Sequence, residues 1–230
     1  MIEAPPLLKI LGRGSRDRPT PRQIEALRGA QTGHLCDAMG GMGALDPVIK
    51  PLAGVPHALC GPAVTADCGP ADILALLAAL TELEPGDVLV QATGGWTGCA
   101  GIGDMVSGMA QNGGAAGVVT DGYARDLPGI QALDFPVFCA GLNPNSPYDK
   151  GPGAVGHPVL VGGRYVASGD MIVGDQDGVV VVPFAQIDPV IAALDGVRAA
   201  EVGLEAEVRS GLAAPQDIRD LVAGPDVVRS

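Results

Sequence analysis

The sequence predicts an α/β domain in which layers of helices pack on a mixed sheet. Strand and helix patterns alternate between residues 61 and 147, which favours parallel strands joined by helices. Residues 157–183 instead form a run of short strand patterns, which favours antiparallel hairpins. No internal repeat or long linker divides the chain. We therefore expect one domain over residues 21–223, preceded by an irregular arm (1–20) and followed by an exposed tail (224–230).

Local signals predict the individual elements. Thr20 can cap a short helix that has Pro21 at its first position, and a second short helix follows it. Gly162–Gly163 and Asp177–Gly178 fit the turns of two hairpins, and residues 184–223 have a helical pattern. Between these we expect, in chain order, a strand within 61–69, a helix within 70–87, a strand within 87–95, a helix within 103–114, a strand within 115–122 and a short strand within 135–147.

Composition limits the kinds of partner. The chain has 230 residues, of which 47% are hydrophobic and 17% charged, which is typical of a globular protein. Its net charge of −12 argues against nucleic acid as a partner, because phosphates would be repelled. A small anionic substrate is compatible with this charge, since one arginine and a divalent metal can make a pocket locally positive.

Cysteine usage and the N-terminal sequence indicate the compartment. The cysteine count is odd and no CxxC motif occurs, so we expect reduced, mostly buried thiols. The acid at position 3 and a short apolar stretch argue against a signal peptide, and no apolar run is long enough for a membrane span. We therefore expect a cytoplasmic protein that does not enter a membrane.

A glycine-rich loop, "GGWTGCAGIGD", covers residues 94–104. It lacks the Gly-Lys-Ser/Thr of a phosphate-binding P-loop, and its glycines are out of register with a dinucleotide fingerprint. Because a strand enters the loop and a helix leaves it, free backbone amides at the helix start could bind a carboxylate or phosphate. The alternative is an ordinary tight connection.

Three charged residues lie near this loop and after the next strand. Asp104 stands at the helix start, and Arg125–Asp126 follow the strand. Taken singly, they could be a helix cap and a surface ion pair. However, a strand–helix–strand crossover brings the helix start and the end of the second strand to one edge of the sheet. Two carboxylates there suit a hard cation such as Mg²⁺, and Arg125 offers a planar fork for a carboxylate.

The pattern Asp104, twenty intervening residues, then Arg125–Asp126 resembles the motif of the class II pyruvate aldolases. These form the 4-hydroxy-4-methyl-2-oxoglutarate/4-carboxy-4-hydroxy-2-oxoadipate aldolase family, in the superfamily that also contains the RraA-type regulators of ribonuclease E. Three further stretches are similar: "GPAVTADC" (61–68), "PGDVLVQATGG" (85–95) and "SGDMIVGDQDGVVVVP" (168–183).

The resemblance implies an RraA-like swivelling α/β/β layered domain. It also implies a homotrimer or a homohexamer with sites at the subunit interfaces. Asp126 is similar to the direct ligand of Mg²⁺ or Mn²⁺, and Asp104 is similar to the residue that holds a metal-bound water. Arg125 would bind the 2-keto acid and stabilise its enolate. The backbone amides around Gly103, Asp104 and Met105 would bind the keto acid's carboxylate.

The sequence departs from the family pattern at several points. The resemblance implies an acidic residue in the first helical region that helps a proton relay, a place that Asp37 can take. The relay histidine expected after the strand "AVTADC" is absent, since Gly69–Pro70 follow. The Asp-Asn pair of that loop is Asp72–Ile73 here. The three histidines (34, 57 and 157) are therefore expected to be surface or structural residues.

The resemblance implies a metal-dependent lyase that cleaves 4-hydroxy-2-oxo acids to pyruvate and a second oxo compound, with oxaloacetate decarboxylase side activity. The alternative is a non-catalytic, protein-binding regulator of the RraA type. A lysine imine could activate the same keto group. Of the three lysines, Lys9 lies in the arm and Lys50 precedes a proline. Lys150 follows Asp149, which would raise its pKa, in a loop with potential site residues.

Overall fold

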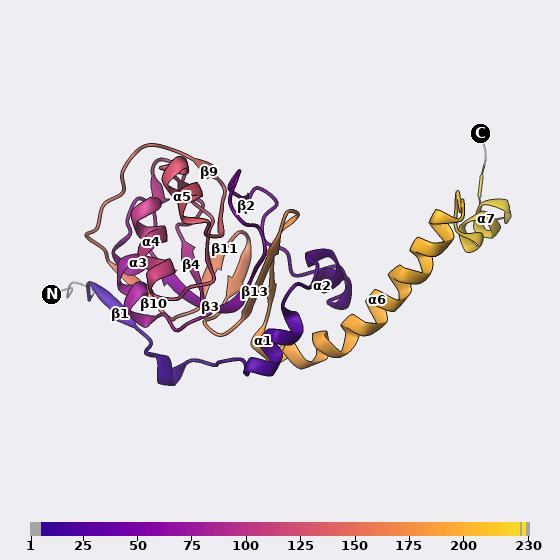
Figure 1. Cartoon of the computed structure of the whole chain (residues 1–230), viewed down its shortest axis with the longest axis horizontal. Helices are drawn as coiled ribbons and strands as arrows, with labels where there is room; N and C mark the ends of the chain where they lie inside the picture. Colours follow the sequence, from indigo (N-terminus) through magenta and orange to yellow (C-terminus); the bar gives the residue numbers. More distant parts are fainter. Residues whose placement is uncertain (1–5, 226, 229–230) are drawn as a thin grey trace.

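The computed structural model describes residues 6–225 and 227–228. Residues 1–5 of the expected arm and residues 226, 229 and 230 of the expected tail lie outside the described residues. At the centre is a mixed sheet with the strand order β1-β10-β3-β4-β6-β8-β2, to which the hairpin β13–β14 is added through β3 (Figure 1).

The middle of the sheet is parallel, as the sequence predicts for residues 61–147, and antiparallel pairs join further strands on either side of it. Parallel pairing joins four neighbours: β3 (Leu59–Asp67), β4 (Val88–Ala92), β6 (Gly117–Thr120) and β8 (Val137–Cys139). Antiparallel pairing adds β10 (Gly153–Val155) to β3 and β2 (Lys50–Pro51) to β8. The outermost strand, β1 (Leu8–Ile10), runs parallel to β10.

Two hairpins form a second layer. Strands β13 (Met171–Asp175) and β14 (Gly178–Val182) are antiparallel, and β13 also pairs with the first half of β3. Strands β11 (Val159–Val161) and β12 (Arg164–Val166) form the other hairpin. The turn predicted at Gly162–Gly163 is confirmed, with positive φ at both glycines. The turn predicted at Asp177–Gly178 lies one residue earlier, at Gln176–Asp177, and Gly178 begins β14.

Helices cover both sides of these sheets (Figure 1). One group lies on the parallel strands: α3 (Leu74–Ala79), α4 (Asp104–Asn112) and α5 (Leu127–Leu133), with a 3₁₀ turn (Leu80–Glu82) extending α3. The other group lies on the β13–β14 side: α1 (Pro21–Leu27), α2 (Thr32–Ala38) and α6 (Ile187–Arg209). Thr20 forms the predicted cap of α1, with Gln23 completing a capping box. Helix α5 was not expected from the sequence.

Alternation along the buried strands creates the layers. In β3, Val64 and Ala66 join an apolar cluster with α3, α4 and α5, while Ala63 joins a cluster with the hairpins. A third cluster lies between the outer face of β13–β14 and the helices α1, α2 and α6. The architecture is therefore helix, sheet, sheet, as predicted, with a further helical layer outside the β13–β14 hairpin.

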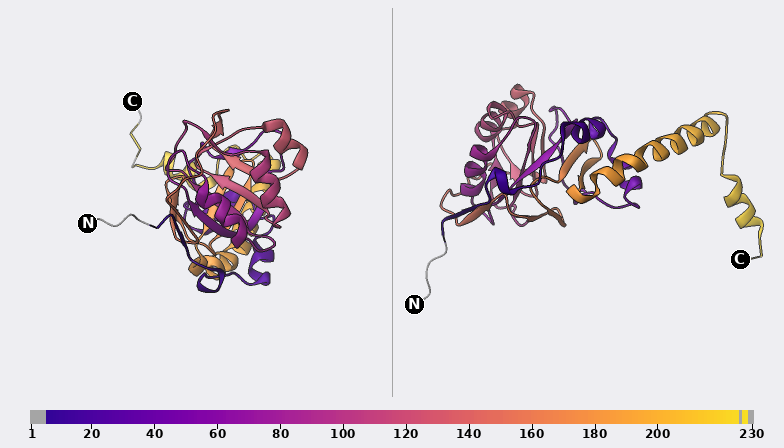
Figure 2. Two further views of the ribbon diagram at one scale, coloured as in Figure 1. Left: turned by 90° about the vertical axis from the view of Figure 1, so that its left-hand side faces the viewer. Right: turned by 90° about the horizontal axis from the view of Figure 1, so that it is seen from below.

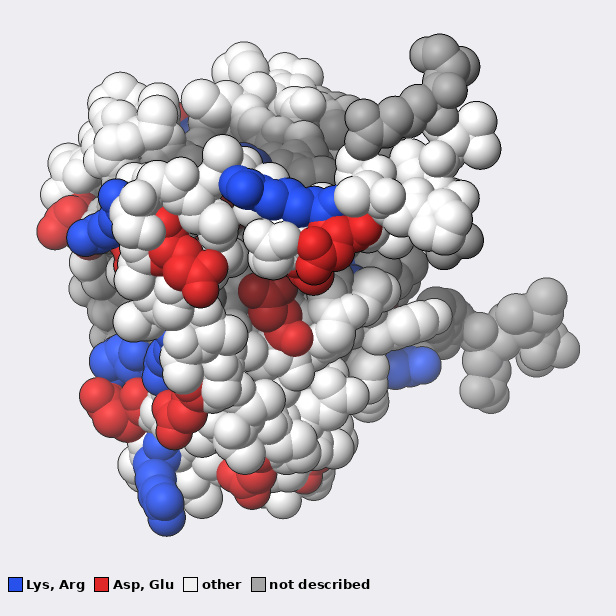
Figure 3. All heavy atoms as spheres, turned by 90° about the vertical axis from the view of Figure 1, so that its right-hand side faces the viewer, with Lys and Arg blue, Asp and Glu red and all other residues white. Residues whose placement is uncertain are grey.

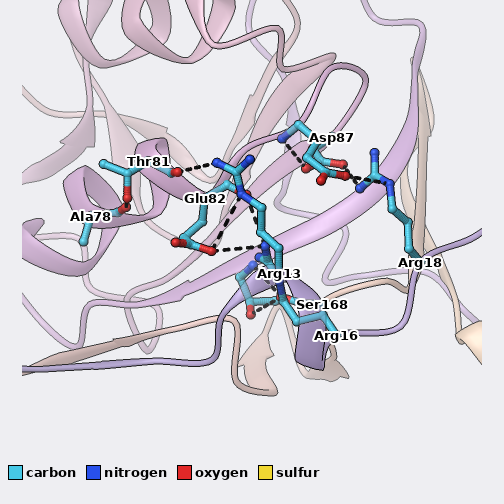
Figure 4. A network of polar contacts seen from close by, with 10 residues as sticks. Arg13, Arg16, Arg18, Ala78, Thr81, Glu82, Asp87 and Ser168 are labelled. Atoms are coloured by element: carbon cyan, nitrogen blue, oxygen red, sulfur yellow. Dashed lines mark hydrogen bonds and ion pairs between the residues drawn. The ribbon is translucent and has the colours of Figure 1, made fainter.

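The N-terminal arm is attached to the domain and is not irregular throughout. It contributes β1 and a 3₁₀ turn at Arg13–Ser15. Beyond that turn, Arg16 Nη2 lies 3.3 Å from Glu82 Oε2, and Arg18 Nη1 lies 2.7 Å from Asp87 Oδ1 (Figure 4). These contacts hold the arm against the start of β4 and the end of α3.

The C-terminal helices leave the domain. Helix α6 buries Ile187, Val190 and Leu194 and then projects away from the sheets (Figures 1 and 2). After a break comes α7 (Gln216–Ala223), which buries no residue. The face from which α6 projects carries acidic and basic side chains close together (Figure 3). Within the described residues, no helix combines the length and apolarity needed to cross a membrane.

Candidate functional site

A cavity of about 300 Å³ lies between the start of α4, the start of α5 and the loop after β9. All the predicted site residues except Asp37 line it. Its lining comprises Ile73, Leu77, Ala100, Gly101, Gly103, Asp104, Met105, Val106, Arg125, Asp126, Ser146, Pro147, Tyr148 and Asp149. The crossover argument therefore places Asp104, Arg125 and Asp126 correctly in one crevice.

A small side sheet sets the positions of the charged residues. Three short parallel strands form it: β5 (Ala100–Ile102), β7 (Tyr123–Ala124) and β9 (Gly141–Leu142). Ile102 pairs with Ala124, and the Arg125 amide donates to Ile102 O at 2.9 Å. The residues that follow β5 and β7, Asp104 and Arg125–Asp126, thus emerge side by side. The sequence analysis missed this sheet and expected only a loop before Asp104.

Asp126 has an unusual backbone conformation. It directly precedes α5 and has φ 58° and ψ 40°, in the left-handed region that a few per cent of non-glycine residues adopt, Asp more often than most. Its side chain makes no capping bond to α5, and its Oδ2 lies 3.2 Å from Arg125 Nε. The Asp126 side chain therefore does not cap α5. Its carboxylate lines the crevice, and among the described residues Arg125 is its ion-pair partner.

Asp104 is the first residue of α4, and glycines make room for it. Its Oδ1 accepts a hydrogen bond from the Met105 amide at 2.7 Å. A Cβ atom on Gly129 would lie 2.5 Å from Asp104 Oδ2, and one on Gly103 would lie 2.9 Å from Asp126 Oδ2. A larger residue at either place would have to displace one of the two carboxylates. Gly129 was not among the predicted site residues.

The amides at the start of α4 are not equally available. The Met105 amide is already engaged by the Asp104 carboxylate, so a ligand would have to displace it. In the part of the chain that the structure describes, no acceptor is assigned to the amides of Gly103 and Asp104. These two donors, at the positive end of the helix, can receive a carboxylate.

Arg125 is oriented by a loop that lies distant in sequence. Its Nη1 donates to Ser146 Oγ at 2.6 Å. Two asparagines hold that loop: Asn143 Nδ2 donates to Thr97 O at 2.8 Å, and Asn145 Nδ2 donates to Gly98 O at 3.0 Å. The glycine-rich loop and the residue 143–149 loop therefore support each other around the crevice. Ser146 carries no local sequence signal for this role.

A second cavity, of about 420 Å³, is lined by two aspartates that already accept hydrogen bonds from the chain. Asp121 lines it, but its carboxylate accepts bonds from Thr93 N, Thr93 Oγ1 and Gly95 N at 2.7–2.9 Å. Asp46 also lines it and accepts a bond from the Val48 amide. Asp121 therefore braces the glycine-rich loop, which explains the polar turn at the end of β6.

Asp37 lies away from the crevice in a single chain. It belongs to α2, which packs against α6 and β14, whereas the crevice is formed by α4, α5 and the side sheet (Figure 1). Asp37 therefore does not line the crevice of its own chain, and its part in a proton relay stays a prediction. The buried His34 contacts Glu201 on α6, and no histidine lines the crevice.

The donor set suits a hard cation. Among residues 6–225 and 227–228, no cluster of three or more His, Cys, Asp and Glu side chains could hold a metal. The candidate ligands in the crevice are therefore the two carboxylates of Asp104 and Asp126. This number is sufficient for Mg²⁺, which is usually bound by one or two carboxylates together with waters. Thiol chemistry is disfavoured, because burial raises the pKa of Cys60 to about 11 and that of Cys68 to about 12. All five cysteines are free and four are buried, as expected.

Comparison with protein families places most of this chain in one group. Residues 32–181 match the RraA-like family model, described as Aldolase/RraA. A protein of Halalkalibacterium halodurans, provisionally named 4-hydroxy-4-methyl-2-oxoglutarate aldolase, is 40% identical over 168 residues, which are 73% of this chain and 80% of the relative. An Arabidopsis thaliana protein with the same provisional name is 34% identical, over 62% of this chain and 84% of its own length.

Solved structures share the fold. An uncharacterised protein from Pseudomonas syringae superposes with a TM-score of 0.74 at 26% identity, covering 85% of this chain and 96% of that one. Streptomyces coelicolor RraAS2, described as an unusual member of the RNase ES inhibitor RraA protein family, has a TM-score of 0.70 at 29% identity, covering 82% and 100%. The predicted RraA-like α/β fold is confirmed.

Proposed function

The chain belongs to the RraA-like, Aldolase/RraA family, and we propose that it is a divalent-metal-dependent lyase. Its reaction would cleave 4-hydroxy-2-oxo acids to pyruvate and a second oxo compound. One observation carries this proposal: Asp104, Arg125 and Asp126 line one crevice. Asp126 has a left-handed backbone conformation, and its carboxylate makes no capping hydrogen bond to α5. Such strain is common at functional sites.

Each residue has a defined part in the proposed reaction. Asp126 would bind Mg²⁺ or Mn²⁺ directly and Asp104 would do so through a water. The cation would act as a Lewis acid toward the keto acid. The amides of Gly103 and Asp104 would hold the substrate carboxylate, joined by Met105 once its amide is released. Arg125 would stabilise the negative charge that develops on the enolate oxygen.

Bond cleavage requires a base for the 4-hydroxyl proton. Loss of that proton and rupture of the C3–C4 bond leave the pyruvate enolate, which then takes up a proton at C3. We assign the relay to Asp37 of a neighbouring subunit, acting through water, in a homotrimer or homohexamer. The rim of the crevice supports such an assembly, because the residues Met105 and Tyr148 are both 71% exposed there and a second subunit could cover them.

The same site accounts for a second reaction. Loss of CO₂ from oxaloacetate leaves the same pyruvate enolate, so the residues that stabilise it would also support decarboxylation. We therefore expect oxaloacetate decarboxylase side activity. The partner implied is a small 2-keto acid, and the net charge of −12 disfavours nucleic acid.

The main competitor is a non-catalytic regulator that binds another protein. It is favoured by the likeness to structures described as RNA-processing or ribonuclease inhibitors. A purely protein-binding surface has no need of a strained Asp126 beside Arg125. Pyruvate release from 4-hydroxy-4-methyl-2-oxoglutarate and from oxaloacetate decides between them. We expect release that needs Mg²⁺ or Mn²⁺ and stops with a chelator, whereas no release with either cation would favour the regulator.

An imine mechanism is the second competitor, with Lys150 as its only nearby candidate. Lys150 Nζ lies 2.6 Å from Asp149 Oδ1, and this hydrogen bond raises the pKa of Lys150. An imine-forming lysine needs its pKa lowered. We therefore expect no covalent adduct when borohydride is added with pyruvate, and a pyruvyl-lysine seen by mass spectrometry would contradict the metal mechanism.

A further inference from the structure

Ser146 lines the crevice beside Arg125. We propose that its hydroxyl donates a hydrogen bond to the oxygen on C4 of the substrate, where negative charge develops as the C3–C4 bond breaks. The inference rests on the proposed function, which supplies groups for the keto acid end and a relay for the 4-hydroxyl proton. It adds the group that stabilises the C4 oxygen itself.

The Ser146 hydroxyl keeps its hydrogen available. Its Oγ accepts a hydrogen bond from Arg125 Nη1 at 2.6 Å. A hydroxyl can still donate its own hydrogen while it accepts. Within the described part of the chain, no acceptor is assigned to the Ser146 hydrogen. Because the bond from the charged guanidinium polarises the hydroxyl, the remaining O–H is a stronger donor than that of an isolated serine.

Arg125 holds Ser146 and Asp126 at two different nitrogens. Its Nε lies 3.2 Å from Asp126 Oδ2, whereas its Nη1 is engaged by Ser146. Its Nη2 has no assigned partner among residues 6–225 and 227–228, so it can receive a substrate oxygen. A keto or enolate oxygen bound there would have Asp126 on one side and Ser146 on the other.

The substrate fits this order of groups. Its carboxylate would be held at the start of α4, so C3 and C4 would extend from there toward the loop that carries Ser146. The oxygens on C2 and C4 are attached to alternate carbon atoms and can face the same side of the substrate. With the C2 oxygen on Arg125, the C4 oxygen can therefore reach the neighbouring Ser146 hydroxyl.

Ser146 is exposed, but the backbone on both sides of it is anchored. Before it, Asn145 O accepts a hydrogen bond from the Ala100 amide at 3.0 Å. After it, the Tyr148 amide donates to Ala71 O at 2.7 Å. The hydroxyl is therefore held in place before substrate binds, and a donor of this kind needs little reorganisation when charge forms.

The proposed reaction gives this donor a charge to stabilise. The 4-hydroxyl proton leaves to the relay, and the electron pair of the O–H bond forms the new carbonyl. The electron pair of the C3–C4 bond stays on the pyruvate enolate. The C4 oxygen is thus more negative in the transition state than in the neutral hydroxyl, so a donor to it lowers the barrier.

The test compares two reactions of the full-length protein with Mg²⁺ present. Exchange of the pyruvate methyl protons with deuterium, followed by NMR, uses the keto acid end and involves no C4 atom. Cleavage of 4-hydroxy-4-methyl-2-oxoglutarate uses both ends. We expect Ser146→Ala to lower kcat of cleavage by at least about tenfold, with KM within about threefold. Exchange should fall by less than about threefold, since it loses only the contact that orients Arg125.

Two controls accompany Ser146→Ala. Ser146→Thr keeps a hydroxyl, and we expect it to restore most of the cleavage rate. Mn²⁺ binding, measured by electron paramagnetic resonance, should be the same in Ser146→Ala and the parent. Loss of Mn²⁺ binding would show that Ser146 supports the metal site, and a threonine variant as impaired as alanine would show that the hydroxyl is not required. Either result would overturn the inference.

The remaining outcomes separate this inference from the proposed function. Cleavage that is unchanged in Ser146→Ala, or that falls only as much as exchange, would mean that Ser146 makes no contact with the C4 oxygen. A fall confined to KM would assign Ser146 to ground-state binding. Both results would overturn the inference and leave the proposed function intact. If the parent catalysed neither exchange nor cleavage, the proposed function would fail as well.

Discussion

Two clusters of arginines and carboxylates in this molecule differ in what surrounds them. In the arm cluster, Asp87 is 1% exposed and both its oxygens accept bonds, from Arg18 Nη1 and from the Glu84 amide (Figure 4). In the crevice, the side chains of Arg125 and Asp126 are 36% and 44% exposed. Charges whose bonds are all made within the chain stabilise the fold, whereas charges left partly free can bind a ligand.

The largest expected effect on activity comes from removing the Asp126 carboxylate in the crevice. Asp126→Ala should reduce pyruvate release by at least about a hundredfold, because the direct metal ligand is lost. Asp126→Asn, which tolerates the left-handed conformation but lacks the charge, should behave alike. Steady-state kinetics with Mg²⁺ measures this, and urea unfolding should show that both variants remain folded. Near-normal activity in Asp126→Asn would assign Asp126 a structural role.

Substitution of Arg125 tests whether the site needs the planar guanidinium or only a positive charge. Arg125→Lys keeps the positive charge but loses the planar donors to Ser146, Asp126 and the substrate. We expect kcat/KM to fall by about 2–4 kcal/mol of transition-state stabilisation, by analogy with the loss of an oxyanion donor. The free energy of unfolding should hardly change. Kinetics within threefold of the parent would mean that Arg125 is only a surface residue.

The arm cluster should respond in the opposite way. Asp87→Ala removes the acceptor of the Glu84 amide and one of the two ion-pair partners of Arg18 in a partly buried place, and we expect a loss of about 1–2 kcal/mol in the free energy of unfolding. Activity per folded molecule should be unchanged. Urea unfolding and kinetics on the same sample check both. A selective loss of activity with normal stability would invalidate the distinction between the two clusters.

The smallest expected effect is a change in the free energy of unfolding with pH, caused by Asp87. Burial raises the pKa of Asp87 above 3.8, although the Glu84 amide and Arg18 act to lower it. Between 3.8 and the folded-state pKa, the folded protein holds a proton that the unfolded chain has released. The contribution of Asp87 to the free energy of unfolding therefore falls as the pH rises through this window.

Asp87→Asn cannot titrate and should lack this part of the pH profile. Urea unfolding of both proteins, from pH 3.8 to about pH 7, gives their difference. We expect the parent to lose stability relative to the variant as the pH rises through the window. A relative gain by the parent would show that Arg18 outweighs burial at Asp87.

Much of the fold could be predicted from the sequence. The elements that were not predicted lack a strong local sequence pattern. Strands β3, β4, β6 and β8 and both hairpins have strong apolar patterns or glycine turns. Strands β5, β7 and β9 are only two or three residues long and owe their pairing to tertiary contacts. Helix α5 begins Leu127-Pro128-Gly129, which resembles a turn, yet Pro128 is tolerated in a first helical turn.

The site shows the same division. The sequence predicted that one crevice would contain Asp104, Arg125 and Asp126, because a strand–helix–strand crossover brings the start of its helix and the end of its second strand to one edge of the sheet. Ser146 and Asp149 reach the crevice from a loop held by Asn143 and Asn145, and no sequence period announces such contacts. The role of Asp37 stays a prediction, because α2 packs against α6 and the β13–β14 hairpin and not at the crevice of its own chain.

The central claim is that Asp126 holds a divalent cation to which a keto acid binds, and Mn²⁺ titration tests it most directly. Electron paramagnetic resonance of free Mn²⁺ gives the number bound, without any catalytic assay. We predict one site per chain in the parent, tightened by pyruvate and lost in Asp126→Asn, while Asp87→Ala retains it. Equal Mn²⁺ binding by the parent and Asp126→Asn, unaffected by pyruvate, would contradict the account.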